Sequence, residues 1–186
     1  DLRMAGYMGC VNDGARLRTS EVFVHLPGGT NSTSFAGVHF ADNFSRGIEG
    51  FEAAGTAPGN AFTLSTGSSG GSWSPSLPTT LAGQVAPGSD VLVVRYLGPN
   101  RARLTTFTPN ASGARVVIET NGLTKVEAGK TYALTDCNQV SFFTASSVGN
   151  NGASFVANGV GGMENYSPST AYVYEATTVA YYVGSE

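Results

Sequence analysis

A serine in a Gly-x-Ser-x-Gly pattern, Gly67-x-Ser69-x-Gly71, formally matches the nucleophile elbow of serine hydrolases. That motif needs a strand before it, a helix after it and a histidine later in the chain. Both histidines, His25 and His39, precede Ser69, and the pattern lies in a run of Ser and Gly where such spacing arises by chance. We therefore expect no catalytic residues and do not expect an enzyme.

The same histidines are poor candidates for a metal site. Two histidines are too few for the usual three-ligand catalytic zinc site, and only Asp42 lies close in sequence to His39. The triplet Asn12-Asp13-Gly14 resembles the start of a calcium loop, yet no acidic residue follows at the spacing of an EF-hand. We expect no metal and no cofactor, and we interpret these residues as parts of turns and loops.

Four asparagines head Asn-x-Ser or Asn-x-Thr triplets: Asn31, Asn43, Asn110 and Asn165. Such triplets mark N-glycosylation sites in eukaryotic secreted proteins. In a chain this rich in Asn, Ser and Thr, triplets by chance are also expected.

Cys10 and Cys137 are the only cysteines, and neither belongs to a Cys-x-x-Cys or metal-binding cluster. One disulfide is the simplest interpretation, and two buried, unpaired thiols are the alternative. Low charge and abundant Asn, Gly and Thr favour an oxidising compartment and therefore the disulfide. We predict that the native protein has no free thiol.

The composition indicates a β-rich protein with many turns. Charged residues make up 12% of the 186 positions, about half the usual share, while Gly reaches 25 residues. Thr, Val, Tyr and Phe suit pleated surfaces, and Gly and Asn suit corners with positive φ. The ten Lys and Arg residues are scattered and the net charge is -3, so nucleic acid is not an expected partner.

Residues 1–186 are expected to form a single domain in three parts. Apolar residues at Leu2, Met4, Ala5 and Met8 predict the end of a helix over 1–10, which Gly6 and Gly9 then weaken. Residues 11–89 are expected to be rich in loops, with a short strand over 21–26 and a long Gly- and Ser-rich excursion over 56–78.

Residues 90–186 are expected to form an antiparallel sheet. Alternating or apolar runs predict strands over 90–97, 102–108, 115–120, 131–145 with a break near Asp136, and 171–183, with Tyr172 and Tyr174 on one face of the last strand. Turn residues between the runs, such as Gly98, Pro99 and Asn100, indicate an antiparallel meander. Val91 to Val94 is apolar on successive residues, which predicts cover on both faces of that strand, most simply by a helix.

Four strings of residues resemble PilW-type minor pilins of bacterial type IV pili. The first is Asp1-Leu2-Arg3-Met4-Ala5-Gly6-Tyr7-Met8-Gly9-Cys10, and the second is Gly88-Ser89-Asp90-Val91-Leu92-Val93-Val94-Arg95-Tyr96. The third is Leu134-Thr135-Asp136-Cys137 leading into Val140-Ser141-Phe142-Phe143, and the fourth is Thr178-Val179-Ala180-Tyr181-Tyr182-Val183. The strings occur in the order expected for the family.

The resemblance implies an α+β, mostly β fold of the pilin kind, in which a short C-terminal remnant of a long N-terminal helix packs on an antiparallel sheet with long loops. It supports a disulfide between Cys10 and Cys137. It also implies an inner-membrane anchor through an upstream helix, a domain that faces the periplasm, and later a place on the cell-surface pilus. Apart from that helix, no membrane contact is expected.

The function that the resemblance implies is priming of pilus assembly and membership of the tip complex that presents a large adhesin. The expected partners are other minor pilins, the major pilin and that adhesin, with Leu2, Met4 and Tyr7 at subunit interfaces. The family's processing site and most of its helix are not in this sequence, and family members usually continue beyond the tyrosine-rich strand. We therefore expect a chain truncated before Asp1, and either truncation or a shorter relative at Glu186.

Two alternatives stay open. A minor pseudopilin of a type II secretion system is expected to have a similar fold. A secreted adhesion module would use Trp73 and exposed tyrosines as stacking platforms for a glycan.

Overall fold

A computed structural model describes residues 2–9, 22–29, 33–61, 71–119, 122–123, 125–158, 162–168 and 170–185. The described part of the chain is nearly all β, with 46% of its residues in strands and 8% in helices. The strands are β1 (Val22–His25), β2 (Ile48–Ala53), β3 (Trp73–Ser74), β4 (Val91–Asn110), β5 (Gly113–Ile118), β6 (Thr131–Thr135), β7 (Val140–Gly149), β8 (Ser154–Asn158) and β9 (Tyr172–Tyr181). The helices are η1 (Leu2–Met4), η3 (Phe40–Asp42), α1 (Thr79–Ala82) and η4 (Asn150–Gly152).

The described residues group into two compact units. Unit 1 consists chiefly of Ile48–Val94 and Thr178–Glu186, and unit 2 of Leu2–Gly47 and Arg95–Thr177. The long strands β4 and β9 contribute residues to both units. The single domain expected from chain length remains a prediction.

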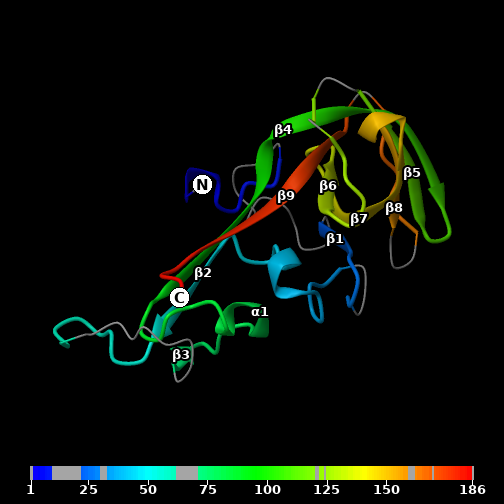
Figure 1. The fold of residues 1–186 in the computed structure, drawn as a ribbon. Coiled ribbons are helices and arrows are strands. Elements are labelled where there is room, and N and C mark those ends of the chain that lie inside the picture. The colour runs from blue at the N-terminus through cyan, green and yellow to red at the C-terminus, as the bar shows by residue number, and fades with distance from the viewer. Residues whose placement is uncertain are drawn as a thin grey trace. The chain divides into compact units, whose positions relative to one another are not determined.

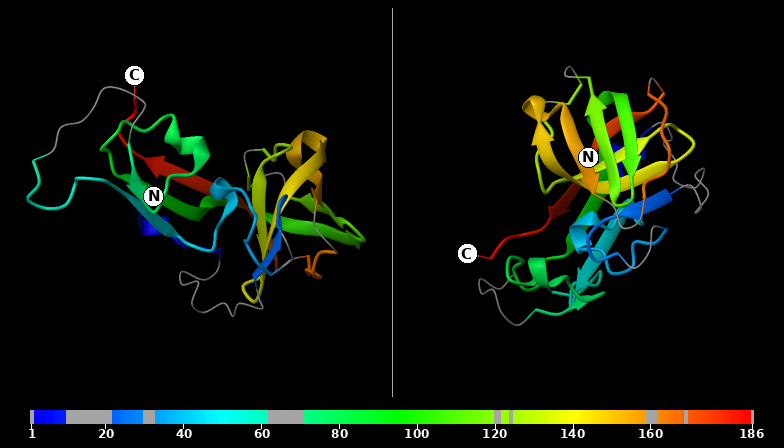
Figure 2. Two further views of the ribbon diagram at one scale, coloured as in Figure 1. Left: turned by 90° about the horizontal axis from the view of Figure 1, so that it is seen from below. Right: turned by 90° about the vertical axis from the view of Figure 1, so that its right-hand side faces the viewer.

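Six strands of unit 2 form a sheet that closes on itself. In the order β4-β5-β8-β7-β6-β9 each strand pairs with the next, and β9 pairs in turn with β4 (Figure 1). Leu104 N donates to Ala171 O at 2.9 Å across that last pair. The curved strands β5 to β8 are seen from two further directions in Figure 2. Closure leaves these strands without free edges, which removes sites for unwanted strand pairing.

The interior of the closed sheet is filled by every second residue of its strands, because side chains alternate between the two faces of a strand. On β6, Tyr132 and Leu134 belong to this core while Ala133 belongs to a different cluster. The Phe143 ring stacks against Tyr132 with centroids 6.3 Å apart and against Phe155 with centroids 5.9 Å apart. These large rings fill a volume that short aliphatic side chains would leave partly empty.

The other face of the sheet in unit 2 carries a second core, which the chain before β2 covers. β1 runs parallel to β7, with Val24 opposite Phe142. The Phe142 ring stacks on Phe44 with centroids 5.0 Å apart and meets Phe35 edge-on at 5.4 Å. β1 therefore extends the sheet beside β7, and the loops that carry Phe35 and Phe44 cover this face.

Unit 1 is built on β2, β3, α1 and the shared strands. β2 pairs antiparallel with β4, from Ile48 opposite Val94 to Phe51 opposite Val91. Phe51 and Val91 are buried, as is Leu81 of α1, whereas Ile48 is 53% exposed. Alternation along β2 thus gives this part of the sheet one buried and one open face.

The α+β fold with a helical remnant packed on the sheet is wrong for the described chain. The only helix at the N-terminus of the described residues is the 3-10 turn η1, without a buried residue. Gly6 and Gly9 then adopt positive φ values of 74° and 95°, conformations that end a helix. In the part of the chain described here, no helix has the length and apolarity needed to cross a bilayer.

Two details of the expected sheet also differ. A turn was predicted at Gly98-Pro99-Asn100, but β4 continues through it as a single strand of 20 residues. β8 was not predicted, and it inserts between β5 and β7 in a sheet that was expected to be a simple meander. The antiparallel pairing itself, including the β6–β7 hairpin around Asp136, is present as predicted.

Candidate functional site

The N-terminal segment lies on the outer face of unit 2, where it continues the hydrogen bonding of β4. Gly6 N donates to Arg95 O at 2.9 Å, and Leu97 N donates to Tyr7 O at 2.9 Å. Gly9 packs so closely that a Cβ added there would lie 2.6 Å from Thr135 Cγ2. Only glycine fits at this position, both for space and for its positive φ.

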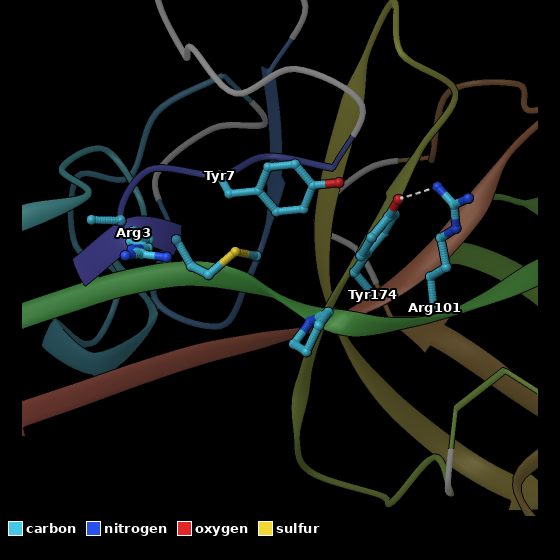
Figure 3. A pocket seen from close by; sticks show the side chains of 7 residues that line it. Arg3, Tyr7, Arg101 and Tyr174 are labelled. Carbon is cyan, nitrogen blue, oxygen red and sulfur yellow. Dashed lines mark hydrogen bonds between the residues drawn. The ribbon is translucent and has the colours of Figure 1, made fainter. Parts of the chain in front are cut away.

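A pocket of about 620 Å³ opens beside this segment (Figure 3). We call it the Arg–Tyr pocket, and its lining residues are Arg3, Met4, Ala5, Tyr7, Pro99, Arg101 and Tyr174. In Figure 3, Arg3 and Arg101 are seen on opposite sides of Tyr7 and Tyr174. The pocket combines two cations with two phenol rings and an apolar floor.

Arg101 of β4 is held in place by two tyrosines of β9. Its Nη1 donates to the Tyr174 hydroxyl at 3.2 Å, and its guanidinium carbon lies 4.4 Å from the centroid of the Tyr172 ring. Stacking and hydrogen bonding together restrict a side chain that is otherwise flexible. Tyr172 and Tyr174 were expected on one face of the strand, and both contact Arg101.

The protonation states of this group are fixed at neutral pH. Burial, and then the neighbouring Tyr174 phenol, raise the pKa of Tyr7 above its ordinary value. The hydrogen bond to Tyr174 also raises the pKa of Arg101. Tyr7 is therefore a neutral phenol and Arg101 a cation across the physiological range, a combination that suits binding of an anion.

The residues expected at subunit interfaces fall at or beside this pocket. Met4 and Tyr7 line it, and Leu2 is 60% exposed immediately before them. Tyr7 packs on Tyr174, and the two rings meet edge-on with centroids 6.2 Å apart. Their role at an interface remains a prediction.

A second polar cluster lies inside unit 2 and joins β1, β7 and the segment 162–168. His25 Nε2 lies 3.0 Å from Glu164 Oε2, and Ser141 Oγ donates to the same oxygen at 3.1 Å. The Ser141 hydroxyl also pairs with the Tyr166 hydroxyl at 2.8 Å. Burial raises the pKa of Tyr166 far above its ordinary value.

This cluster contains serine, histidine and a carboxylate, but not in the order of a catalytic triad. In a triad the histidine lies between the serine and the acid. Here Ser141 and His25 both bind Glu164, and both are buried. The arrangement is that of a structural cross-link between three segments.

The other histidine and its acidic neighbour have separate local roles. His39 Nδ1 accepts a hydrogen bond from Ala41 N at 3.3 Å and so caps η3. Asp42 Oδ1 accepts from the Thr131 hydroxyl at 2.6 Å. Among the residues that the structure describes, no group of three His, Cys, Asp or Glu side chains is arranged to hold a metal ion.

Of the two cysteines, Cys137 is described and Cys10 lies outside the described residues. Cys137 follows β6 with a φ of 74° and is not a free thiol. Gly9, the residue before Cys10 in the sequence, packs against Thr135, two residues before Cys137. The Cys10–Cys137 disulfide remains a prediction that this placement favours.

Several other predicted residues lie outside the described residues: Asn12, Asp13, Gly14, Asn31, Gly67 and Ser69. Two of the asparagine triplets form local turns, since Asn43 Oδ1 accepts from Ser45 N at 3.2 Å and Asn110 Oδ1 accepts from Ser112 N at 2.9 Å. Asn165 is exposed, and its backbone oxygen accepts from Gln139 Nε2 at 2.9 Å.

Trp73 is half-buried in unit 1. Its indole N–H donates to Ser89 O at 2.8 Å, and its side chain lines a pocket of about 260 Å³ beside Glu52. The N–H group of the ring is thus used within the protein, and a ligand would meet Trp73 through a face of the ring.

Sequence reasoning missed Arg3, Arg101, Glu164 and Tyr166. In the contacts just described, the partners of Glu164 and Tyr166 lie 23 to 139 positions away in the sequence. Residues that far apart give no periodic signal in one sequence. Met4 and Tyr7 had been named as interface residues, and the alternation of Tyr172 and Tyr174 indicated another part of the site.

Comparisons with known proteins give no relative for this chain: no family model matches it, and neither a curated protein nor a solved structure is detectably similar.

Proposed function

We propose that this protein is an extracytoplasmic assembly subunit, a PilW-type minor pilin that helps to prime type IV pili and forms part of the tip complex presenting an adhesin. Its mechanism is burial of complementary surface against other proteins, with no covalent chemistry. Other minor pilins, the major pilin and the tip adhesin are its proposed partners.

The observation that carries the proposal is the way in which the four resembling strings pack within each unit. In unit 2 the first string meets the second through Gly6 and Arg95, and the third through Gly9 and Thr135. In unit 1 the second string meets the fourth, because Val183 N donates to Ser89 Oγ at 2.8 Å. Strings that are distant in sequence are thus neighbours in the fold, as parts of one inherited domain would be.

The surface beside the first string has the composition of a protein-binding site. Exposed Leu2 stands next to a pocket with Met4, Tyr7 and Arg101. Tyr and Arg are enriched among residues that dominate binding energy, and Met is enriched in interfaces generally. This supports Leu2, Met4 and Tyr7 as proposed interface residues.

The experiment that tests the proposal is a pull-down, followed by size-exclusion analysis, against soluble domains of other minor pilins and the tip adhesin. We expect a stoichiometric complex with at least one of them. Leu2→Glu should weaken that complex, because it places an uncompensated charge in a contact that buries apolar surface.

A matched control is Ile48→Glu, which introduces the same charge at another exposed apolar position. It should leave the complex intact. A protein that folds but binds none of the candidate partners would contradict the pilus assignment and favour the pseudopilin or the independent adhesion module.

A further inference from the structure

We infer that the Arg–Tyr pocket recognises carboxylate side chains on an acidic peptide segment of a partner protein. This rests on the proposed function for the kind of partner, and on the described residues for its chemistry. Arg101 is the anchor, Arg3 supplies a second positive charge, and Tyr7 and Tyr174 form the walls.

Arg101 is arranged for this role before any ligand arrives. Its contacts with the Tyr174 hydroxyl and the Tyr172 ring orient the guanidinium, and among the described residues only Tyr174 accepts a hydrogen bond from it. A guanidinium has five N–H donors in a planar fork that matches a carboxylate. Because the side chain is already ordered, less conformational entropy is lost on binding.

The two cations of the pocket have no acidic partner within the described part of the chain. Ion pairs there join His25 with Glu164, Arg103 with Glu119, and Lys130 with Glu127 and Glu175. Arg3 and Arg101 take part in none of them. No described carboxylate pairs with these two guanidiniums, and their positive charge favours association with a ligand of negative charge.

The pocket fits a peptide segment better than a single small anion. Arg3 and Arg101 stand at different sides of the tyrosines, so a segment with more than one acidic residue can reach both (Figure 3). Met4 and Pro99 offer apolar surface for residues between the acids. Tyr7 is a neutral phenol that contacts Tyr174, so this wall of the pocket carries no negative charge that would repel a carboxylate.

The test is amide chemical-shift mapping of the full chain with a peptide that is N-acetylated and C-amidated and has aspartates on both sides of a leucine. The same peptide with asparagines is the comparison. We expect the acidic peptide to shift Gly6, Tyr7 and Arg101 and to bind about 10-fold more tightly than the amide peptide, as loss of a charge-assisted hydrogen bond requires.

Arg101→Gln should weaken binding of the acidic peptide about 10-fold. Arg115→Gln is the matched control, because Arg115 is an exposed arginine on β5 that does not line the pocket, and it should bind as the parent does. Arg101→Lys, which keeps the charge without the fork, should fall between parent and Arg101→Gln.

Three outcomes would overturn the inference. They are equal binding of the amide peptide, equal losses of affinity in Arg101→Gln and Arg115→Gln, and shifts in the pocket with a uronic-acid oligosaccharide but not with the peptide.

The pull-down distinguishes failure of this inference from failure of the proposed function. If Arg101→Gln still forms the pilin complex, the pocket is not part of the assembly surface, and the proposed function stands. If the acidic peptide binds but no pilin complex forms, the pocket recognises acidic segments, and the proposed function is contradicted.

Discussion

Unit 2 closes its sheet around an aromatic core, whereas the sheet of unit 1 has an open face. In unit 2, Phe143 lies between Tyr132 and Phe155 with no exposed surface. In unit 1, Tyr181 and Val183 are 44% and 49% exposed. The first arrangement gains stability from many packed atoms, and the second leaves apolar surface in contact with water.

Unit 1 depends more on individual polar anchors at its loops. Asp90 Oδ1 accepts from Ala53 N at 2.8 Å and from the Thr56 hydroxyl at 3.1 Å, while Ser89 Oγ accepts from Val183 N. Such anchors stabilise a region locally, by about 1 kcal/mol for each net hydrogen bond. Substitutions in the core of unit 2 should therefore lower the stability of that unit strongly, whereas loss of an anchor in unit 1 should cause local opening.

The largest effect is expected for Phe143→Ala in the closed sheet. Removing a fully buried phenyl ring should lower the free energy of unfolding by about 3–5 kcal/mol, through lost burial and the cavity left behind. Urea denaturation measures this loss. Tyr181→Ala, at an exposed position of unit 1, should change it by less than about 0.5 kcal/mol. Similar losses in both variants would show that the aromatic core of unit 2 does not contribute more stability than the exposed surface of unit 1.

The next largest effect is expected for Glu164→Ala, which removes the acceptor shared by His25 and Ser141. Both of these side chains are buried, so the free energy of unfolding should fall by about 1.5–3 kcal/mol. Thermal and urea unfolding would measure the change. Glu119→Ala, which breaks an exposed pair with Arg103, is the control and should cost about 0–1 kcal/mol. Equal costs would show that the buried cluster is no cross-link.

A smaller and local effect is expected for Ser89→Ala in unit 1. Loss of the bond to Val183 N should cost about 1 kcal/mol and speed hydrogen exchange of that amide by roughly fivefold. Amides of β6 and β7 should exchange at their original rates. Faster exchange in β6 and β7 as well would mean that the two units open together, as one cooperative domain.

At neutral pH the smallest effect is expected for Tyr166→Phe, at about 1 kcal/mol or less. The effect of this substitution on stability should be seen most clearly at alkaline pH. Burial raises the pKa of Tyr166, so the folded chain keeps a proton that the unfolded chain releases above about pH 10. Stability contributed by the neutral phenol is therefore present below pH 10 and lost as pH rises beyond it.

Tyr166→Phe should make the fall in stability above pH 10 less steep, measured by urea denaturation across the alkaline range. Part of the slope should persist in Tyr166→Phe, since burial also raises the pKa of Tyr132. An unchanged slope in Tyr166→Phe would contradict a protonated, buried phenol in the native state.

The local pattern of apolar and turn residues predicted most of the strands, but it did not predict that the sheet closes on itself. The run of apolar and β-branched residues identified β4, β5, β6, β7 and β9 because their periodicity and turn residues lie within a few positions of one another. β8 was missed, since Ser154–Asn158 is short and weakly patterned. The turn predicted at Gly98-Pro99-Asn100 was wrong, because turn propensity there is overridden by the strand pairing around it.

The helix expected at the N-terminus was also predicted from local spacing and is also overridden by tertiary contacts. Leu2, Met4 and Met8 have helical spacing, but Gly6 and Gly9 turn the chain so that it pairs with β4 and packs on Thr135. The candidate site likewise contains some residues that the sequence indicated and others that it did not. Met4 and Tyr7 were named from the sequence, whereas Arg101 acquires its role only through Tyr172 and Tyr174.

Richness in strands and turns and low charge follow from the sequence alone, whereas the resemblance of four strings to minor pilins stays a prediction. Tertiary structure decided that six strands close on themselves, that Glu164 joins His25 to Ser141, and that Arg101 and Tyr7 line one pocket. The reason is physical. Propensity and alternation act between residues a few positions apart, while closure, buried hydrogen bonds and pockets arise between residues that only folding brings together.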